Sequence, residues 1–360
     1  TFKPKSMDYT KEITELIEIT IKEGASDLHL SAGYPPTVRV SGMLIPLVKK
    51  EVLTAEDTEG FMEVLLTKEN KELFLQEKEI DFSYSYQNNE ARFRGNCSVS
   101  RGSISIVMRL VPKRIRTLEE LGLPTVLGDF ARRQQGFFLV VGPVGHGKST
   151  TLAAMIDIIN SERSDHIVTI EDPIEYMFEP KKSMINQREV RIDTKDFHTA
   201  LVELFRQDVD VAMIGEMRGQ ETIGTAVTAA ETGHLVLSTL HTNSAAQTID
   251  RIIDSFPPAQ QDQVRIQLSS SLLGIFSQRL VQRVSGGLVP AYELLINTKA
   301  VANLIREGRT HEIDSVIETG SDHGMVDMNR SLAELVQKGD ITVETARMHS
   351  LNPTLLERLL

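Results

Sequence analysis

The pattern of hydrophobic and polar positions predicts a mixed α+β region at the start of the chain. Residues 12–23 place apolar side chains at helical spacing, and Gly24 then supplies a helix stop. The segments DLHLS, PTVRV and VSGML follow, and their turn residues predict short strands joined by tight turns. Thr54, with Asp57 three residues later, predicts the start of a second helix.

Residues 81–110 continue this pattern as strands, with Asn-Asn at 88–89 and Arg-Gly at 101–102 as turns. We therefore predict a small α+β domain over residues 7–112. The first six residues have no clear periodicity and are left out of this prediction. A basic segment containing PKRIR follows, and we predict a linker over residues 113–124.

A different pattern fills residues 125–360, where short apolar runs alternate with helical segments. The runs GFFLVV, HIVTI, DVAMIG and LVLSTL are almost continuously apolar, which predicts parallel strands covered on both faces in an α/β domain. After about residue 255 the pattern becomes helical. Its clearest case is QVRIQLSSSLLGIFSQRLVQRV, for which we expect a helix across residues 263–284.

Composition limits the classes of function that fit this organisation. The chain has 360 residues, 41% hydrophobic and 25% charged, which is enough for two domains with separate cores. No apolar run approaches the roughly 18 residues that span a bilayer, so we expect a cytoplasmic protein. Cys97 is the single cysteine, which excludes an intrachain disulfide and a CxxC-paired zinc site. The net charge of -11 argues against a nucleic acid partner.

The segment GPVGHGKS at 142–149 matches the phosphate-binding loop pattern GxxxxGK[ST], between an apolar strand and an apolar helix. A glycine-rich turn with a solvated lysine is the alternative, and the flanking segments argue against it. We expect ATP here, with Lys148 at the β- and γ-phosphates and Ser149 on Mg²⁺. His146 is interpreted as a tolerated side chain at a variable position. The predicted nucleotide-binding residues are Gly142, Pro143, Val144, Gly145, His146, Gly147, Lys148, Ser149 and Thr150.

Acidic residues follow two of the other predicted strands. HIVTI leads into Glu171, Asp172 and Glu175, and the run VAMI ends in Gly215 and Glu216. Each acid taken singly fits a solvated loop carboxylate. Because ligands of open α/β sheets lie at the carboxyl ends of strands, we expect both groups to face the phosphate-binding loop and to serve hydrolysis.

His234 and His241 lie on either side of the run LVLSTL. Seven residues of strand extend about 23 Å, and the odd spacing directs the two side chains to opposite faces, so they do not share a metal. Each histidine taken singly fits a hydrogen-bonded structural role. His241, at the carboxyl end of the run, is also a candidate γ-phosphate sensor.

Six motifs give the chain a specific resemblance. It resembles the PilT family of type IV pilus retraction ATPases, within the type II/IV secretion ATPase superfamily. The resemblance implies a PAS-like N-terminal α+β domain followed by a RecA-like P-loop ATPase domain with a helical C-terminal part. The motifs are GASDLHLSAG at 24–33, the phosphate-binding loop, TIEDPIEY at 169–176, INQREV at 185–190, GEMR at 215–218 and TAAETGHLVLSTLHTNSA at 228–245.

The resemblance also implies roles for particular residues. Glu175 corresponds to the water-activating carboxylate, and Glu216 to the Walker B acid on the magnesium side. His234 and His241 correspond to the paired histidines of the family. The implied assembly is a homohexamer, peripheral at the inner membrane, that drives pilus retraction and twitching motility through the inner-membrane pilus platform protein. A paralogous retraction ATPase is a further candidate partner.

Arginines of the first domain form a separate group of candidates. Residues 92–109 alternate apolar positions with Arg92, Arg94 and Arg109, so the arginines share one face of the strands. A solvated basic edge is the plain interpretation, and we prefer it for Arg92. For Arg94, Arg101 and Arg109 the resemblance implies contact with the triphosphate of a neighbouring subunit.

Other functions remain as alternatives. The family carries AIRNLIRE near its C-terminus, whereas Ala302 here replaces the arginine of that segment, so an accessory, PilU-like retraction ATPase fits as well. Pilus-assembly and type II secretion ATPases usually have a four-cysteine zinc insertion and a long N-terminal extension, which this sequence does not contain. A DNA-translocating ATPase would show salt-dependent DNA binding. A non-hydrolysing scaffold is disfavoured by the presence of both Glu175 and Glu216.

Overall fold

The computed structural model describes residues 7–40, 42–87 and 90–360. The chain forms two compact units, the first ending at Lys113 and the second running from Arg114 to Leu360. The first six residues and the predicted turn at 88–89 lie outside the described residues.

The first unit is the small α+β fold that the sequence predicts. Its six-stranded antiparallel sheet has the order β3-β2-β1-β6-β5-β4. Thr54 and Asp57 form the expected capping box at the start of α2. The elements are α1 (Tyr9–Lys22), β1 (Asp27–Ser31), β2 (Thr37–Val40), β3 (Met43–Pro46), α2 (Ala55–Leu65), α3 (Lys68–Glu77), β4 (Glu79–Tyr86), β5 (Ala91–Ser100) and β6 (Ser103–Leu110).

The β5–β6 hairpin has the two unlike faces that the alternation predicts. Phe93 and Met108 are fully buried, whereas Arg94 and Arg109 lie opposite each other in the register. The turn at Arg101 and Gly102 has positive φ at both residues, 50° and 79°. Two left-handed residues suit a tight turn between right-twisted strands.

The second unit is built on a seven-stranded sheet of order β13-β12-β7-β11-β10-β8-β9. All its strands are parallel except β13, which runs antiparallel to β12. The four predicted strands appear as β7, β8, β10 and β11. The elements are α4 (Val126–Ala131), β7 (Gly136–Val141), α5 (Lys148–Glu162), β8 (His166–Glu171), β9 (Met184–Glu189), α6 (Phe197–Leu204), β10 (Val211–Ile214), α7 (Gln220–Glu231), β11 (Leu235–Leu240), α8 (Ala245–Asp254), α9 (Pro258–Ser271), β12 (Leu272–Gln282) and β13 (Leu288–Ile296).

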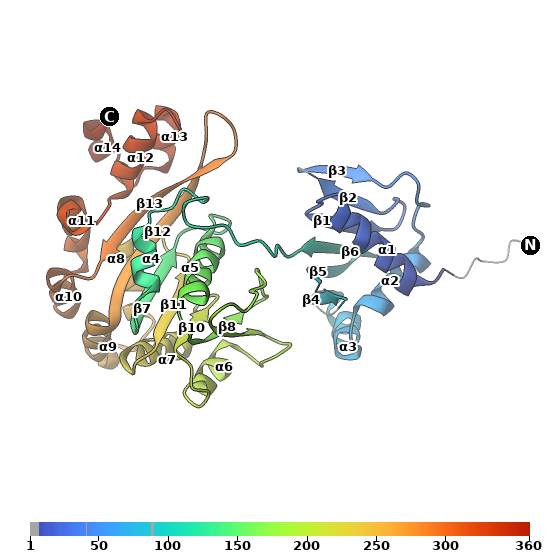
Figure 1. Cartoon of the computed structure of the whole chain (residues 1–360), viewed down its shortest axis with the longest axis horizontal. Coiled ribbons are helices and arrows are strands. Elements are labelled where there is room, and N and C mark those ends of the chain that lie inside the picture. The colour runs from blue at the N-terminus through green and yellow to red at the C-terminus, as the bar shows by residue number, and fades with distance from the viewer. Residues whose placement is uncertain (1–6, 41, 88–89) are drawn as a thin grey trace, which may run out of the picture. The chain divides into compact units, whose positions relative to one another are not determined.

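Helices cover both faces of this sheet (Figure 1). Phe138 and Val140 of β7 pack with residues of α4 and α5, whereas Leu139 and Val141 pack with residues of α6 to α9. The central strands are therefore buried on both sides, which explains their continuous apolar runs. No helix within the described ranges is both long and apolar enough to cross a membrane.

The prediction of one helix across residues 263–284 is wrong in its second half. Helix α9 ends at Ser271, and β12 begins at Leu272. β12 pairs with β7 on one edge and β13 on the other, and it buries Ile275 and Phe276 on opposite faces. A doubly buried strand and a buried helix have similar apolar runs, so their periodicity alone does not separate them.

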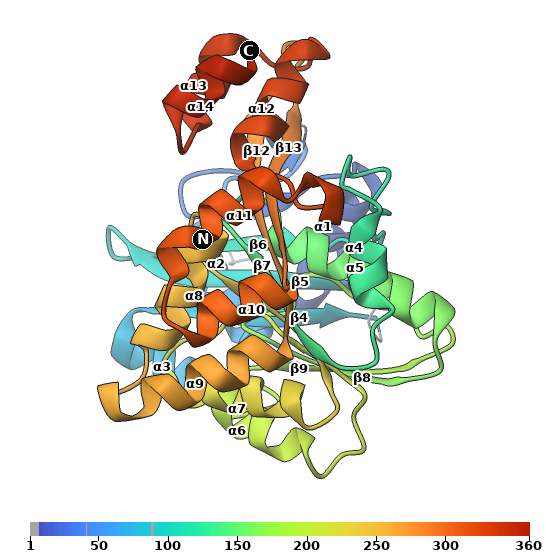
Figure 2. The ribbon, with the colours of Figure 1, turned by 90° about the vertical axis from the view of Figure 1, so that its left-hand side faces the viewer.

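The C-terminal part is otherwise helical, as expected. The β12–β13 hairpin extends beyond the body of the sheet to these helices (Figure 2). Val281 and Val289 of the hairpin pack against Met328 and Leu332. The helices are α10 (Lys299–Arg306), α11 (Ile313–Thr319), α12 (Met328–Gln337), α13 (Val343–His349) and α14 (Pro353–Leu359).

Candidate active site

The phosphate-binding loop connects β7 to α5 and requires glycine at two points. Gly142 has a φ of 140°, and a Cβ atom there would lie 2.3 Å from the carbonyl oxygen of Gln278. Gly147 has a φ of 81°, and its Cβ would lie 2.9 Å from the side-chain amide of the same residue. Glycine therefore permits both the backbone conformation and the close approach of β12.

Two residues of β12 hold this loop. The Gln278 side chain accepts a hydrogen bond from Thr151 Oγ1 at 2.6 Å and donates one to the His146 carbonyl at 2.9 Å. The backbone N–H of Leu280 donates to His146 Nδ1 at 2.9 Å. The interpretation of His146 as a merely tolerated side chain is therefore wrong, because its ring and its carbonyl both bond to β12. No local pattern marks Gln278, which lies in the segment predicted as a helix.

Lys148 lies at the centre of the loop and is 7% exposed. Its Nζ donates to the carbonyl oxygens of Gly142 and Pro143, both at 2.9 Å, and lies 3.3 Å from Nδ1 of His241. Burial lowers the pKa of Lys148, and the negative charges of Glu175 and Glu216 act against this shift. The Lys148 ammonium group therefore lies against the backbone of the phosphate-binding loop.

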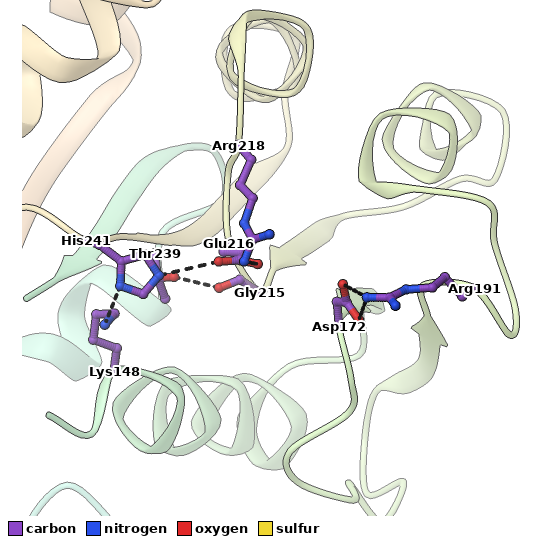
Figure 3. A network of polar contacts seen from close by, with 8 residues as sticks. All are labelled: Lys148, Asp172, Arg191, Gly215, Glu216, Arg218, Thr239 and His241. Carbon is purple, nitrogen blue, oxygen red and sulfur yellow. Dashed lines mark hydrogen bonds and ion pairs between the residues drawn. The ribbon is translucent and has the colours of Figure 1, made fainter. Parts of the chain in front are cut away.

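The His241 imidazole lies between Lys148 and Glu216 (Figure 3). Its Nε2 is 3.4 Å from Glu216 Oε2, while Glu216 Oε1 forms an ion pair with Arg218 at 2.7 Å. Thr239 Oγ1 donates to the Gly215 carbonyl at 2.6 Å, which ties the end of β11 to the end of β10. The imidazole therefore links Lys148 of the phosphate-binding loop to Glu216 at the end of β10.

The acids at the end of β8 and in the loop after it differ in their surroundings. Glu171 is 5% exposed and accepts hydrogen bonds from Thr169 Oγ1 at 2.7 Å and from the Glu175 backbone N–H at 3.2 Å. Burial raises its pKa to about 7. Asp172 instead forms an ion pair with Arg191 at 3.0 Å (Figure 3). Glu175 lines the cavity beside the phosphate-binding loop.

One cavity of about 310 Å³ gathers the predicted residues of four adjacent parallel strands. They lie beyond the carboxyl ends of β7, β8, β10 and β11, where an α/β sheet binds its ligands. The predicted acidic, basic and hydroxyl residues that line it are Lys148, Ser149, Glu171, Asp172, Glu175, Glu216 and His241.

Other predicted residues lie elsewhere. His234 precedes the opposite end of β11, where its Nδ1 is 3.0 Å from the Ala229 carbonyl and its ring packs edge-on against Phe205. Arg94, Arg101 and Arg109 belong to the first unit. Arg109 Nε donates to the buried Asp27 carboxylate at 2.8 Å, and the Arg109 side chain is 67% exposed.

The donors of the cavity suit Mg²⁺ bound together with a phosphate. Ser149 and Glu216 supply a hydroxyl and a carboxylate, and Mg²⁺ prefers such hard oxygen ligands. Within the described residues, no cluster of three or more His, Cys, Asp or Glu side chains could hold a metal. In nucleotide sites Mg²⁺ is usually held by one or two protein groups together with substrate phosphates.

A glycine-rich loop between a buried strand and a helix, facing carboxylates on adjacent parallel strands, defines a P-loop ATPase with a RecA-like catalytic domain. The model of the Type II/IV secretion system protein family matches residues 5–347. The chain therefore belongs to this family.

Individual relatives agree with this assignment. The chain is 46% identical over 341 residues to the type IV pilus retraction ATPase PilT of Pseudomonas aeruginosa, covering 93% of this chain and 97% of that protein. It is 39% identical over 340 residues to the type IV pilus ATPase PilU of the same organism, covering 94% and 88%. The solved structure of the pilus retraction motor PilT with bound ADP superimposes with a TM-score of 0.89 at 47% identity, covering 96% and 99%.

Proposed function

We propose that this chain is a hexameric ATPase motor that powers retraction of type IV pili, and hence twitching motility, through the inner-membrane pilus platform. The observation that carries the proposal is the single cavity joining Lys148, Glu175, Glu216 and His241. Its support from relatives is the similarity to PilT over 97% of that protein's length.

In this proposal the phosphate-binding loop supplies most of the binding of ATP. The N-terminus of α5 presents backbone N–H groups, and Lys148 adds a positive charge for the β- and γ-phosphates. Ser149 and Glu216 would hold Mg²⁺, which neutralises developing charge on the phosphates. The bonds from Gln278 and Leu280 to His146 keep the loop in its binding conformation.

Hydrolysis requires a group that orients the attacking water. Glu175 takes this role, accepting a proton from the water as its oxygen bonds to the γ-phosphorus and the bond from that phosphorus to the β-phosphate oxygen breaks, which releases ADP and phosphate. His241 lies between Lys148 and Glu216, so it senses whether the γ-phosphate is present. Arg94, Arg101 and Arg109 of a neighbouring subunit stabilise the charge that develops in the transition state.

The test compares two site variants with a matched surface control. Lys148→Ala should lose nucleotide binding and ATPase activity, and Glu175→Gln should bind Mg-ATP but hydrolyse it at least about 100-fold more slowly. Lys181→Ala removes an exposed lysine paired with Asp157 and should leave turnover unchanged. Cells carrying either site variant should keep surface pili that no longer retract. Wild-type turnover in purified Lys148→Ala protein would refute the mechanism.

A second candidate is an accessory retraction ATPase. The 39% identity to PilU over 94% of this chain favours it, as does Ala302 on α10 in place of the family's arginine. Expression in a strain that lacks both retraction ATPases distinguishes the two roles. Retraction restored by this chain alone assigns the principal motor, whereas retraction only with a paralogue assigns the accessory role.

A further inference from the structure

The loop that follows β8 carries Glu175 into the cavity, and side chains of the sheet hold its backbone. Gln187 Oε1 accepts from the Phe178 N–H at 3.0 Å, and Gln187 Nε2 donates to the Tyr176 carbonyl at 2.7 Å. Glu189 Oε2 accepts from the Ile174 N–H at 3.1 Å. Side chains of β9 therefore form hydrogen bonds with the loop backbone both before and after Glu175.

Gln187 is the centre of this arrangement. Besides its two bonds to the loop, its Nε2 donates to Glu171 Oε1 at 3.2 Å. Glu171 in turn accepts from the backbone N–H of Glu175 at 3.2 Å. One amide side chain therefore fixes the loop directly at two points and indirectly at Glu175 itself.

The strand register places these groups on one face of the sheet. In the parallel pair of β8 and β9, Thr169 lies beside Gln187 and Glu171 beside Glu189. Successive residues of a strand point to opposite faces, so Gln187 and Glu189 share one face and Asn186 lies on the other. Asn186 accordingly bonds to His166 Nε2 at 3.0 Å, which is a contact unrelated to the loop.

A further contact ties the same loop to the nucleotide-binding helix. The hydroxyls of Tyr176 and Thr150 lie 2.8 Å apart, and Thr150 belongs to the first turn of α5. Tyr176 is therefore held through its carbonyl by Gln187 and through its hydroxyl by α5. Hydrogen bonds therefore connect the loop both to β9 and to the helix that follows the phosphate-binding loop.

We propose that Gln187 is a positioning residue for ATP hydrolysis, holding the loop 172–178 so that Glu175 faces the attacking water. The inference rests on the proposed role of Glu175. A displacement of about 1 Å in a catalytic group can slow a reaction about 100-fold, and a contact that matters only in the transition state lowers kcat rather than substrate affinity. The side-chain amide of Gln187 is thus required for turnover more than for affinity.

The experiment uses the full chain and two substitutions with different chemistry. Gln187→Ala removes all three side-chain hydrogen bonds. Gln187→Glu keeps an acceptor for the Phe178 N–H but loses the N–H donor to Glu171 and to the Tyr176 carbonyl. Both should lower kcat about 10-fold to 100-fold while KM and the affinity for a fluorescent ADP analogue change less than about twofold. Asn186→Ala, one residue away on the other face, should retain wild-type kcat.

A second measurement separates positioning from general loss of structure. In a Glu175→Gln background, adding Gln187→Ala should reduce the residual rate less than about twofold, because residues acting through one group are not additive. The inference would be overturned if Gln187→Ala lowered the rate by the same factor in the Glu175→Gln background as in wild type. It would also be overturned if Gln187→Ala raised KM and left kcat unchanged. Wild-type kcat in both Gln187 variants beside an inactive Glu175→Gln would refute the inference alone. Wild-type turnover of Glu175→Gln would refute the role of Glu175, and the inference with it.

Discussion

At the scale of single residues, Glu293 is a buried acid that takes no part in the proposed reaction. It lies on β13, is 3% exposed, and accepts a hydrogen bond from the Ala245 N–H at the start of α8 at 2.8 Å. Burial raises its pKa to about 8, with Asp314 and Asp327 adding to the shift and Arg279 opposing it. The fold therefore keeps a carboxyl group protonated at neutral pH.

This burial makes stability depend on pH. Between the ordinary glutamate pKa near 4 and the folded value of about 8, the folded protein holds a proton that the unfolded chain has released. The free energy of unfolding should therefore fall as pH rises through this window, by at most about 1.4 kcal/mol per pH unit from this group.

Glu293→Gln retains an acceptor for Ala245 and cannot ionise. We expect the free energy of unfolding of the variant minus that of wild type to be larger at pH 8 than at pH 5.5. Chemical denaturation of both proteins at both pH values measures this difference. Glu171 titrates in an overlapping range, but it is present in both proteins and cancels in the comparison. Equal pH dependence in the two proteins would show that Glu293 is ionised in the fold at both values.

At the scale of elements, β12 packs directly against the phosphate-binding loop. Gln278 meets the loop through its backbone at Gly142 and through its side chain at Gly147 and His146. The strand thus supports the loop by direct packing and a hydrogen bond. The β12–β13 hairpin therefore contacts the phosphate-binding loop, even though its sequence carries no recognised motif.

Two alanine substitutions test this support. Gly142→Ala places a Cβ atom against the backbone of Gln278, whereas nothing lies within 4 Å of a Cβ added at Gly145. Both glycines have positive φ, so each substitution costs about 1–3 kcal/mol of backbone strain. Gly142→Ala should therefore raise KM for ATP at least about tenfold more than Gly145→Ala. Equal KM values for the two variants would mean that the backbone of β12 moves aside for the added Cβ atom at little cost.

At the scale of the whole molecule, the proposed ring requires residues from two subunits at each site. Arg109 lies in the first unit with most of its side chain exposed, although Asp27 binds one nitrogen. Its guanidinium retains donors for a neighbouring triphosphate. The proposal is that Arg109 completes the site of an adjacent copy.

Mixed rings test this sharing. Lys148→Ala and Arg109→Ala proteins should each be nearly inactive, and co-assembled rings should regain part of the ATPase activity because some sites contain neither defect. Arg39→Ala is the matched control, since Arg39 lies 3.8 Å from the same Asp27 carboxylate. Absence of recovery in demonstrably mixed hexamers would contradict action between subunits. Full activity of Arg109→Ala alone would remove Arg109 from the site.

Local patterns in the sequence predicted much of this protein. The alternation in β5 and β6, the apolar runs of β7, β8, β10 and β11, and the capping box of α2 each depend on neighbours a few residues apart. The phosphate-binding loop and the acids after two strands were found in the same way. Parallel strands bring their carboxyl ends to one edge, so the gathering of these residues followed from the predicted topology.

Tertiary structure decided the features that depend on distant segments. Leu272–Gln282 becomes a strand because the open edge of β7 and the chain of β13 pair with it, and no local signal records those partners. His146 is an acceptor because Leu280 is folded against it, and Gln187 is central because β9 lies beside β8. A hydrogen bond is made by whichever groups the fold brings within about 3 Å, whereas sequence periodicity reports only which side of an element is buried.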